Sequence, residues 1–427
     1  MQNLFERAAE ALWGPFTFMI IILFGGYLFV KSKAKFIIKA PISLLKCFEN
    51  KKDNDISPFM SLSNALAATM GTGNIVGVAA AISSGGPGAL FWMQIAAIAG
   101  MMIKFSETAL AVRFSSIAAG PMGYLQKIRR IGKPLAILFA VSCVAASVGS
   151  GCITQSNSAA QALVELSVPY WMCAIVFGVI SWKISGDGVK GIMKLMTYII
   201  PLITVGYIAI SVAVIFRYKS SLTDALKIVV NSAFCFDSFV GGATGYTAKQ
   251  AIRYGLARGI FSNEAGMGSS AIAYSLVKNA DEKQQGMMAV VEVFADTVIC
   301  CSLTGLTLIL TDSYSIKNGA SAAIDAFSLG LGPAFGYAAA IFIALFGLAA
   351  VCGWYTYGIK ALEFLLSDKK YINDSFRLIY SIFSAAGAII PFSTVWAASD
   401  FFTGIMMIIN IFGLLMLVNH INDIINS

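Results

Sequence analysis

The sequence predicts an all-α, polytopic membrane protein with about eleven transmembrane helices. Hydrophobic residues make up 58% of the 427 and charged residues only 12%, about half the charged fraction of an average soluble domain. The apolar residues fall in runs of about 20, the length that an α-helix needs to cross a bilayer. Basic residues cluster in alternate loops between these runs. We therefore expect one integrated transmembrane domain rather than several soluble ones.

The expected spans follow one another along the whole chain. The seventh has the weakest apolar signal, because Lys249 and Arg253 lie within it. The approximate limits of the spans are 13–31, 59–83, 88–113, 133–164, 169–186, 190–216, 236–257, 285–311, 332–361, 373–392 and 399–419.

The distribution of charge predicts the orientation. With the N-terminus outside and the C-terminus in the cytoplasm, 25 of the 30 basic residues lie at the cytoplasmic face, as the positive-inside rule requires. The basic residues left for the outer side are Arg7, Arg217, Lys219, Lys227 and Lys317. Basic loops against an anionic leaflet also explain the net charge of +8 without a nucleic-acid partner. We expect a multi-pass protein of the cell's inner (plasma) membrane.

Several function classes lack their sequence features. The eight cysteines show no metal-ligand spacing, and the single histidine, His420, excludes a histidine-based catalytic triad. No glycine-rich segment ends in the Gly-Lys-Ser/Thr of a phosphate-binding loop, which argues against an ATP-driven pump. No short pore-loop repeat suggests a channel. These features favour a carrier over an enzyme, with no cofactor.

Two spans contain helix-breaking residues in their interiors. Residues 70–74 read MGTGN, and 241–245 read GGATG about 170 residues later. Broken backbone survives in a bilayer only where it is buried in protein or lines a cavity. The breaks lie in spans 2 and 7, so spans 2–6 and 7–11 form two sets of five in opposite orientations. This pattern is typical of inverted-repeat transporters with discontinuous helices. The alternative is close helix packing through small residues such as Gly73 and Gly77.

The expected domain boundaries follow from this repeat. Residues 1–57 hold an extra N-terminal span and a basic linker, 58–217 the first repeat and 218–427 the second. A broken helix offers N–H groups for a carboxylate and C=O groups for a cation. Two breaks together suit a zwitterionic amino acid and a co-transported cation. The substrate-binding residues expected at the breaks are Gly71, Thr72, Gly73, Asn74, Gly241, Gly242, Thr244 and Gly245.

Polar residues in other spans are further candidates. Gln155 and Asn157 lie two apart in span 4, so at most one faces the pocket. Asp296 and Thr297 lie near the middle of span 8, where an intramembrane acid indicates function by default, here cation binding. Asn74 either ligates the cation through its side-chain oxygen or caps the outer half-helix.

Larger and charged residues complete the candidates. Trp354 either limits the size of the pocket or is simply packed. Arg253, Arg258 and Glu264 flank the expected cytoplasmic end of span 7. They suit an inner gate of ion pairs, or a basic anchor of the positive-inside kind.

Several segments resemble the alanine/glycine:cation symporter family. They read GTGNIVGVAAAISSGGPGALFWM, KFSETALAVRF, TQSNSAAQAL, GGATGYTAKQAIRYGLARGIFSNEAGMGSSAIAYS and CGWYTYGIKALEFL, in order between residues 58 and 415. The resemblance implies import of small neutral amino acids, alanine or glycine, with sodium by alternating access. It also implies two inverted five-helix repeats. A carrier of the same fold that is proton-coupled or uncoupled is the alternative.

One departure from the family concerns a sodium site. The resemblance implies a site formed by backbone near Ala67, Thr69 and Met70 together with a Ser-Thr pair in span 9. Here the pair is replaced by Ala349 and Ala350. Methyl groups cannot replace hard oxygen ligands. We therefore expect that site to be weakened, with coupling shifted to a site near Asn74 and Asp296, or to protons.

Overall fold

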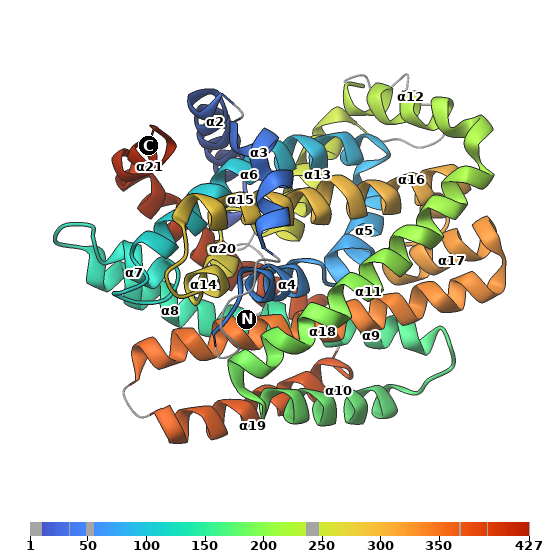
Figure 1. Ribbon diagram of the computed structural model, residues 1–427. Coiled ribbons are helices and arrows are strands. Elements are labelled where there is room, and N and C mark those ends of the chain that lie inside the picture. Colours follow the sequence, from blue (N-terminus) through green and yellow to red (C-terminus); the bar gives the residue numbers. More distant parts are fainter. Residues whose placement is uncertain are drawn as a thin grey trace.

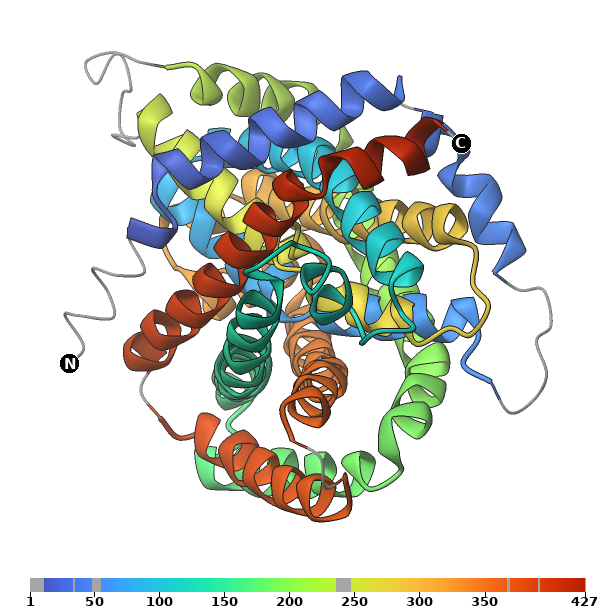
Figure 2. The same cartoon turned by 90° about the vertical axis from the view of Figure 1, so that its left-hand side faces the viewer.

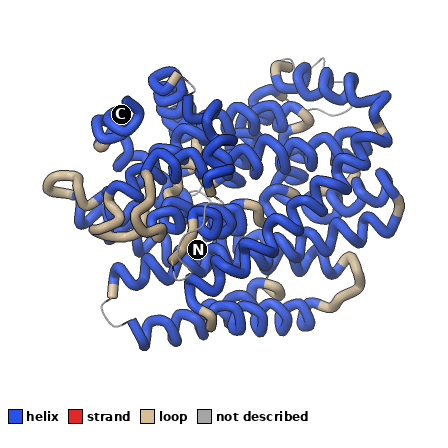
Figure 3. Tube along the Cα trace, viewed as in Figure 1, coloured by secondary structure: helices blue, strands red, loops and turns tan. Residues whose placement is uncertain are grey.

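The computed structural model describes residues 11–33, 35–47, 55–235, 247–366, 369–390 and 392–426. Every regular element in this part of the chain is a helix, as Figure 3 shows. The first half contains α2 (Pro15–Ser32), α3 (Lys35–Lys46), α4 (Pro58–Thr69), η1 (Thr72–Asn74), α5 (Val76–Gly85), α6 (Gly88–Arg113), α7 (Pro121–Leu125), α8 (Gly132–Val148), η2 (Gly149–Ile153), α9 (Thr154–Val164), α10 (Tyr170–Ser185) and α11 (Gly188–Arg217). The second half contains η3 (Lys219–Ser221), α12 (Leu222–Ala233), α13 (Ala248–Asn263), α14 (Ser269–Ser275), α15 (Glu282–Val293), η4 (Phe294–Cys301), α16 (Ser302–Thr311), η5 (Ser313–Ser315), α17 (Gly319–Leu331), α18 (Pro333–Leu365), α19 (Lys369–Gly387), α20 (Phe392–Met416) and α21 (Val418–Asn426).

The membrane character of the fold is confirmed. Among the described residues, seven helices are long and apolar enough to cross a membrane, or eight if the bent pair α4–α5 counts as one span. The apolar helix α10 has 16 residues. Ten of the expected spans coincide with helices or continuous helix series. The remaining one, 236–257, overlaps only α13, since 236–246 lie outside the described residues.

The first break is where the sequence predicts it. Helix α4 begins with Ser57 as N-cap, whose side chain accepts a hydrogen bond from the Met60 N–H, and with Pro58 in the first turn. It ends at Thr69, because Met70 leaves the helical conformation with ψ 51°. A single 3₁₀ turn, η1, then leads into α5, and the two halves meet at 57°.

The second described break lies at 264–268, and the predicted position, 241–245, lies outside the described residues. Helix α13 begins with a capping box between Thr247 and Gln250 and runs to Asn263. The chain then turns through Glu264, at φ 55°, and two glycines with φ of 90° and 72°, Gly266 and Gly268. Positive φ is the conformation in which glycine is favoured. Helix α14 begins immediately afterwards, so the helix is interrupted at 264–268.

The two broken helices lie next to each other and run in opposite directions. Helix α13 packs against α5, and α14 packs against α4. Each half of span 2 therefore packs against the half of the second broken helix that lies on its own side of the breaks. Helix α6 runs past both breaks and contacts α13, α14 and α15. The two interruptions meet in the centre of the molecule (Figure 1).

Helices at equivalent positions in the two expected repeats also pack together. Helix α6 contacts α15, α8 and α9 contact α18, and α10 contacts α19. These are spans 3 and 8, 4 and 9, and 5 and 10. Figure 2 shows α10 and α19 side by side at the edge of the molecule, away from the breaks. Such pairing is what a two-fold relation between the repeats produces, and the repeat boundaries at 58 and 218 stay a prediction.

Candidate functional site

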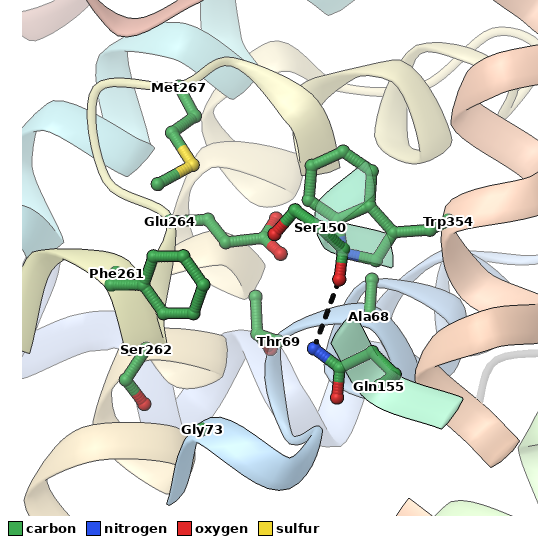
Figure 4. Close-up of a pocket in the computed structure, with 10 residues that line it drawn as sticks. All are labelled: Ala68, Thr69, Gly73, Ser150, Gln155, Phe261, Ser262, Glu264, Met267 and Trp354. Atoms are coloured by element: carbon green, nitrogen blue, oxygen red, sulfur yellow. Dashed lines mark hydrogen bonds between the residues drawn. The ribbon is translucent and has the colours of Figure 1, made fainter. Parts of the chain in front are cut away.

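A narrow cavity lies where the two breaks meet, and Figure 4 shows its lining. Space for water is about 10 Å³, roughly the room of one ordered water. The cavity is lined by Ala68, Thr69 and Gly73 of the first break, Phe261, Ser262, Glu264 and Met267 of the second, Ser150 and Gln155 of the α8–α9 series, and Trp354 of α18. All of these elements except α18 are interrupted near the cavity, either by a break or by the π-turn η2. Irregular helix geometry is common at functional sites.

Gln155 secures the first break. Its Oε1 accepts hydrogen bonds from the N–H and the Oγ1 hydroxyl of Thr72, both at 2.9 Å. Its Nε2 donates to the Ser150 carbonyl at 3.4 Å. Asn157, by contrast, donates to the carbonyls of Gly387 and Ile390, away from the cavity. Only one of the two amides faces the pocket, as the helical spacing predicts.

An oxygen-rich cluster lies beside the first break. Asn74 Nδ2 donates to Asp296 Oδ1 at 2.7 Å and to the Asp296 carbonyl at 3.0 Å. Asp296 Oδ2 accepts from Ser262 at 2.9 Å and from Thr297 at 2.7 Å. The Asn74 side-chain oxygen is buried and has no hydrogen-bond partner. Three predicted cation-binding residues, Asn74, Asp296 and Thr297, are thus adjacent, and Ser262 joins them from the second broken helix.

This cluster has suitable chemistry for a sodium ion as cargo. Carboxylate, hydroxyl and amide oxygens are hard ligands of the kind that hard cations prefer. The unpartnered oxygen of Asn74 is a buried acceptor without a donor, an arrangement that is costly unless a cation or water completes it. Asn74 is both a candidate ligand and a structural link between the first break and η4, because its amide N–H groups bind Asp296.

The second predicted cation site would lie between the end of α4 and α18. The Met70 N–H donates to Leu66 O and the Gly71 N–H to Thr69 O, so the carbonyl of Ala67 has no backbone donor. A Cβ added at Gly71 would lie 3.0 Å from the Ala350 methyl. Ala350 therefore faces the first break, where it offers no oxygen, and Ala349 is also buried.

Trp354 and the π-turn η2 fit each other closely. A Cβ at Gly151 would lie 2.2 Å from Trp354 Cβ, so only glycine allows the two backbones this approach. Trp354 is 2% exposed and lines the cavity. The Trp354 side chain therefore packs directly against the backbone of η2.

The three residues predicted as a gate are divided between α13 and the second break. Arg253 and Arg258 lie on α13, the half-helix that packs against α5, with guanidinium groups over the rings of Tyr254 and Phe261. Glu264 is buried at the break and lines the cavity. The expected limits of span 7 end at 257, whereas α13 continues to Asn263. Both arginines therefore lie on the half-helix before the second break, whereas α14 follows the break.

Some predicted residues fall outside the described residues, namely Gly241, Gly242, Thr244 and Gly245. Other residues of the site were missed by sequence reasoning, in particular Ser150, Phe261, Ser262 and Met267. The segment FSNEAGMGSS contained a usable signal. Its polar residues and its two glycines, Gly266 and Gly268, interrupt an otherwise apolar region.

A buried ion pair lies on the α14 side of the cavity. Lys104 Nζ on α6 is 2.9 Å from Glu292 Oε1 on α15, and neither side chain is exposed. Lys104 also donates to Ser270 at 2.6 Å, and Tyr274 donates to Glu292 Oε2 at 3.0 Å. The charges are paired and hydrogen-bonded, which a buried ion pair requires. This pair joins α6, α14 and α15 directly below the second break.

A helical membrane protein in which two interrupted helices enclose a cavity between paired repeats is a secondary transporter with the five-plus-five inverted-repeat fold. The solved structures agree. A crystal structure of MhsT in complex with L-phenylalanine matches with a TM-score of 0.57 at 16% identity, covering 84% of this chain and 89% of that one. The protein is a transporter and not an enzyme.

The chain belongs to the sodium:alanine symporter family, whose family model matches residues 1–427. The sodium/alanine symporter AgcS of Methanococcus maripaludis is 33% identical over 436 residues, which cover 97% of this chain and 94% of that protein. The probable sodium/glutamine symporter GlnT of Bacillus subtilis is 33% identical, over 98% of this chain and 89% of that protein. The family resemblance seen in the sequence motifs is confirmed.

Proposed function

We propose that this protein imports a small neutral amino acid, alanine or glycine, together with sodium by alternating access. The observation that carries the proposal is the cavity between the two breaks, which combines polar backbone ends with bulky apolar walls. Trp354, Phe261 and Met267 supply those walls. A site of this shape favours a substrate with a methyl group or no side chain.

The sodium assignment is supported by the oxygens of Asn74, Asp296, Thr297 and Ser262. No cofactor is needed, because an ion gradient supplies the driving force. One charge moved across 100 mV is worth about 2.3 kcal/mol, and a tenfold concentration ratio costs about 1.4 kcal/mol. One sodium ion therefore supports roughly 40-fold accumulation before its own concentration gradient is counted.

Alternating access would use the breaks as hinges. The half-helices α4 and α14 lie on one side of the cavity and α5 and α13 on the other. With the N-terminus outside, α4 and α14 would close the cytoplasmic path in a cell's inner membrane. The two repeats, 58–217 and 218–427, would then move against each other around a fixed site.

Proton coupling is a second candidate, favoured by one observation. Ala350 presents a methyl group to the first break, at a place where the family resemblance implies a hydroxyl ligand. A site short of oxygens binds sodium weakly.

Uptake into proteoliposomes tests both candidates. We expect labelled alanine and glycine to accumulate when sodium is the only gradient, and to exchange without ATP. Accumulation driven by a pH gradient in sodium-free buffer would favour the proton-coupled carrier. A conductance that does not saturate with alanine would contradict both, and uptake of glutamine but not alanine would contradict the proposed substrate.

A further inference from the structure

We propose that the carboxylate of Glu264 binds the ammonium group of the transported amino acid. The inference rests on the proposed function and names the group that recognises the positive end of the substrate. Glu264 is the only ionisable side chain among the ten residues that line the cavity. Figure 4 shows its carboxylate pointing into the space between the two breaks, with Trp354 beside it.

Among the described residues, the Glu264 carboxylate forms no direct ion pair. Its Oε2 accepts a hydrogen bond from Ser269, a neutral donor. None of the ion pairs in the described part of the chain includes Glu264, and the nearby Lys104 is paired with Glu292. A buried carboxylate without a partner charge is costly. A positively charged ligand in the cavity would relieve that cost.

The surroundings of Glu264 suit an ammonium group better than a metal ion. Phe261, Met267 and Trp354 offer no hard oxygen ligands, whereas an aromatic face attracts an organic ammonium. The oxygen-rich cluster at Asp296 is a separate and better place for sodium. The two positive charges, one on the ion and one on the substrate, thus have separate carboxylates.

The opposite end of the substrate has a matching place. Gly73 lines the same cavity just before α5, whose N-terminal end is the positive end of a helix dipole. A carboxylate near Gly73 and an ammonium near Glu264 would orient an amino acid across the cavity from the first break to the second. Closure of the two breaks would then depend on a ligand that carries both charges.

The test is equilibrium binding of labelled alanine to the purified full-length protein at saturating sodium. Glu264→Gln keeps the size of the side chain and removes its charge. A hydrogen bond to a charged group is worth about 1.5–3 kcal/mol, so we expect the alanine affinity to fall about 10- to 100-fold. The half-saturating sodium concentration should change less than about threefold.

Glu107→Gln is the matched control. Glu107 is a buried carboxyl on α6 that accepts a hydrogen bond from Asn410 at 2.6 Å and does not line the cavity. Asn410 also donates to the Gly266 carbonyl at 2.9 Å, a contact that Glu107→Gln leaves in place. Glutamine retains that acceptor, so alanine affinity should stay within about threefold of the parent. Glu264→Asp, which keeps the charge but withdraws it by one methylene, should bind with intermediate affinity and serves if Glu264→Gln does not fold.

Alanine affinity in Glu264→Gln within threefold of the parent would overturn the inference. So would a tenfold shift in sodium half-saturation with alanine affinity unchanged, since Glu264 would then serve the ion. Where only Glu264→Asp folds, an affinity equal to the parent's would also overturn it. In each of these cases the parent still transports alanine, so the proposed function stands. A parent that neither binds nor transports alanine or glycine would contradict the proposed function itself.

Discussion

The two helix breaks both line the cavity, but different interactions stabilise them. The first, at 70–75, is a short 3₁₀ turn held by side chains from other helices, Gln155 and Asp296. The second, at 264–268, turns through three residues at positive φ, Glu264, Gly266 and Gly268, and Asn410 of α20 donates to the Gly266 carbonyl. The first break therefore depends on polar contacts between helices, and the second on the conformational freedom of glycine. Substitutions should affect them differently.

The largest effect should come from the glycines of the second break. A Cβ at Gly268 would lie 2.4 Å from Pro121 Cγ, and its φ of 72° is strained for any other residue. We expect Gly268→Ala to abolish alanine uptake, by at least about 100-fold or through loss of folded protein. Gly77→Ala is the control, because nothing lies within 4 Å of a Cβ there. Equal uptake by the two variants would show that the second break is not constrained as described.

The next effect concerns the polar contact at the first break. Gln155→Ala leaves the buried N–H and hydroxyl of Thr72 without their acceptor, which costs about 1–3 kcal/mol. We expect the apparent affinity for alanine to fall about 10- to 100-fold. Asn157→Ala, which breaks contacts to Gly387 and Ile390 instead, should lower thermal stability and leave that affinity within threefold. A loss of alanine affinity in Asn157→Ala but not in Gln155→Ala would show that Asn157, and not Gln155, supports the substrate site.

A smaller and more selective effect is expected at the oxygen cluster. Asn74→Ala removes the unpartnered oxygen and the link to Asp296. The sodium concentration for half-maximal uptake should rise about tenfold, roughly the effect of one lost oxygen ligand in a hard-cation site. Thr307→Val, which removes another buried unpartnered polar atom, is the control and should leave sodium dependence unchanged. Identical sodium curves for Asn74→Ala and the parent would make Asn74 purely structural.

The smallest effect should be a gain. Ala349→Ser with Ala350→Thr adds two hydroxyls to α18, where the Ala350 methyl faces the first break. If these positions replace a Ser-Thr pair, sodium activation of uptake should sharpen by a few-fold, roughly as expected from added hard ligands. A parent that already shows tight, cooperative sodium activation, unaltered by the two hydroxyls, would contradict this interpretation of the replacement.

The difference between the breaks also explains what the sequence could predict. The apolar runs specify the spans, because the bilayer demands about 20 apolar residues whatever the contacts of each helix. The first break was visible because Gly71, Thr72 and Gly73 interrupt such a run. The sequence predicts a second break at the conspicuous glycines of 241–245, which lie outside the described residues. The break at 264–268 has no such cluster of adjacent glycines, and composition alone does not show that it lies at the level of the first break.

The site residues divide in a similar way. Asn74 and Asp296 were both predicted from their polarity within a span, and the structure brings them into contact. Their contact with Ser262 depends on the position of α13, which local sequence does not give. Glu264 was expected in a gate at the cytoplasmic end of span 7. The placement of Glu264 in the cavity follows from the turn at 264–268 and became visible only in three dimensions.

The most direct test of a single substrate site between the two breaks fills the cavity from each side. A Cβ at Gly73 would lie 3.9 Å from Phe261, which is an ordinary contact. The rest of the side chain in Gly73→Leu would extend into the cavity that Gly73 lines. Met267→Phe does the same from the second break. In sodium buffer, both variants should remain folded and lose binding of labelled alanine, each by about 100-fold or more, because the larger side chains would occupy the space proposed for the substrate. Binding at parental affinity in either folded variant would contradict a site shared by the two breaks.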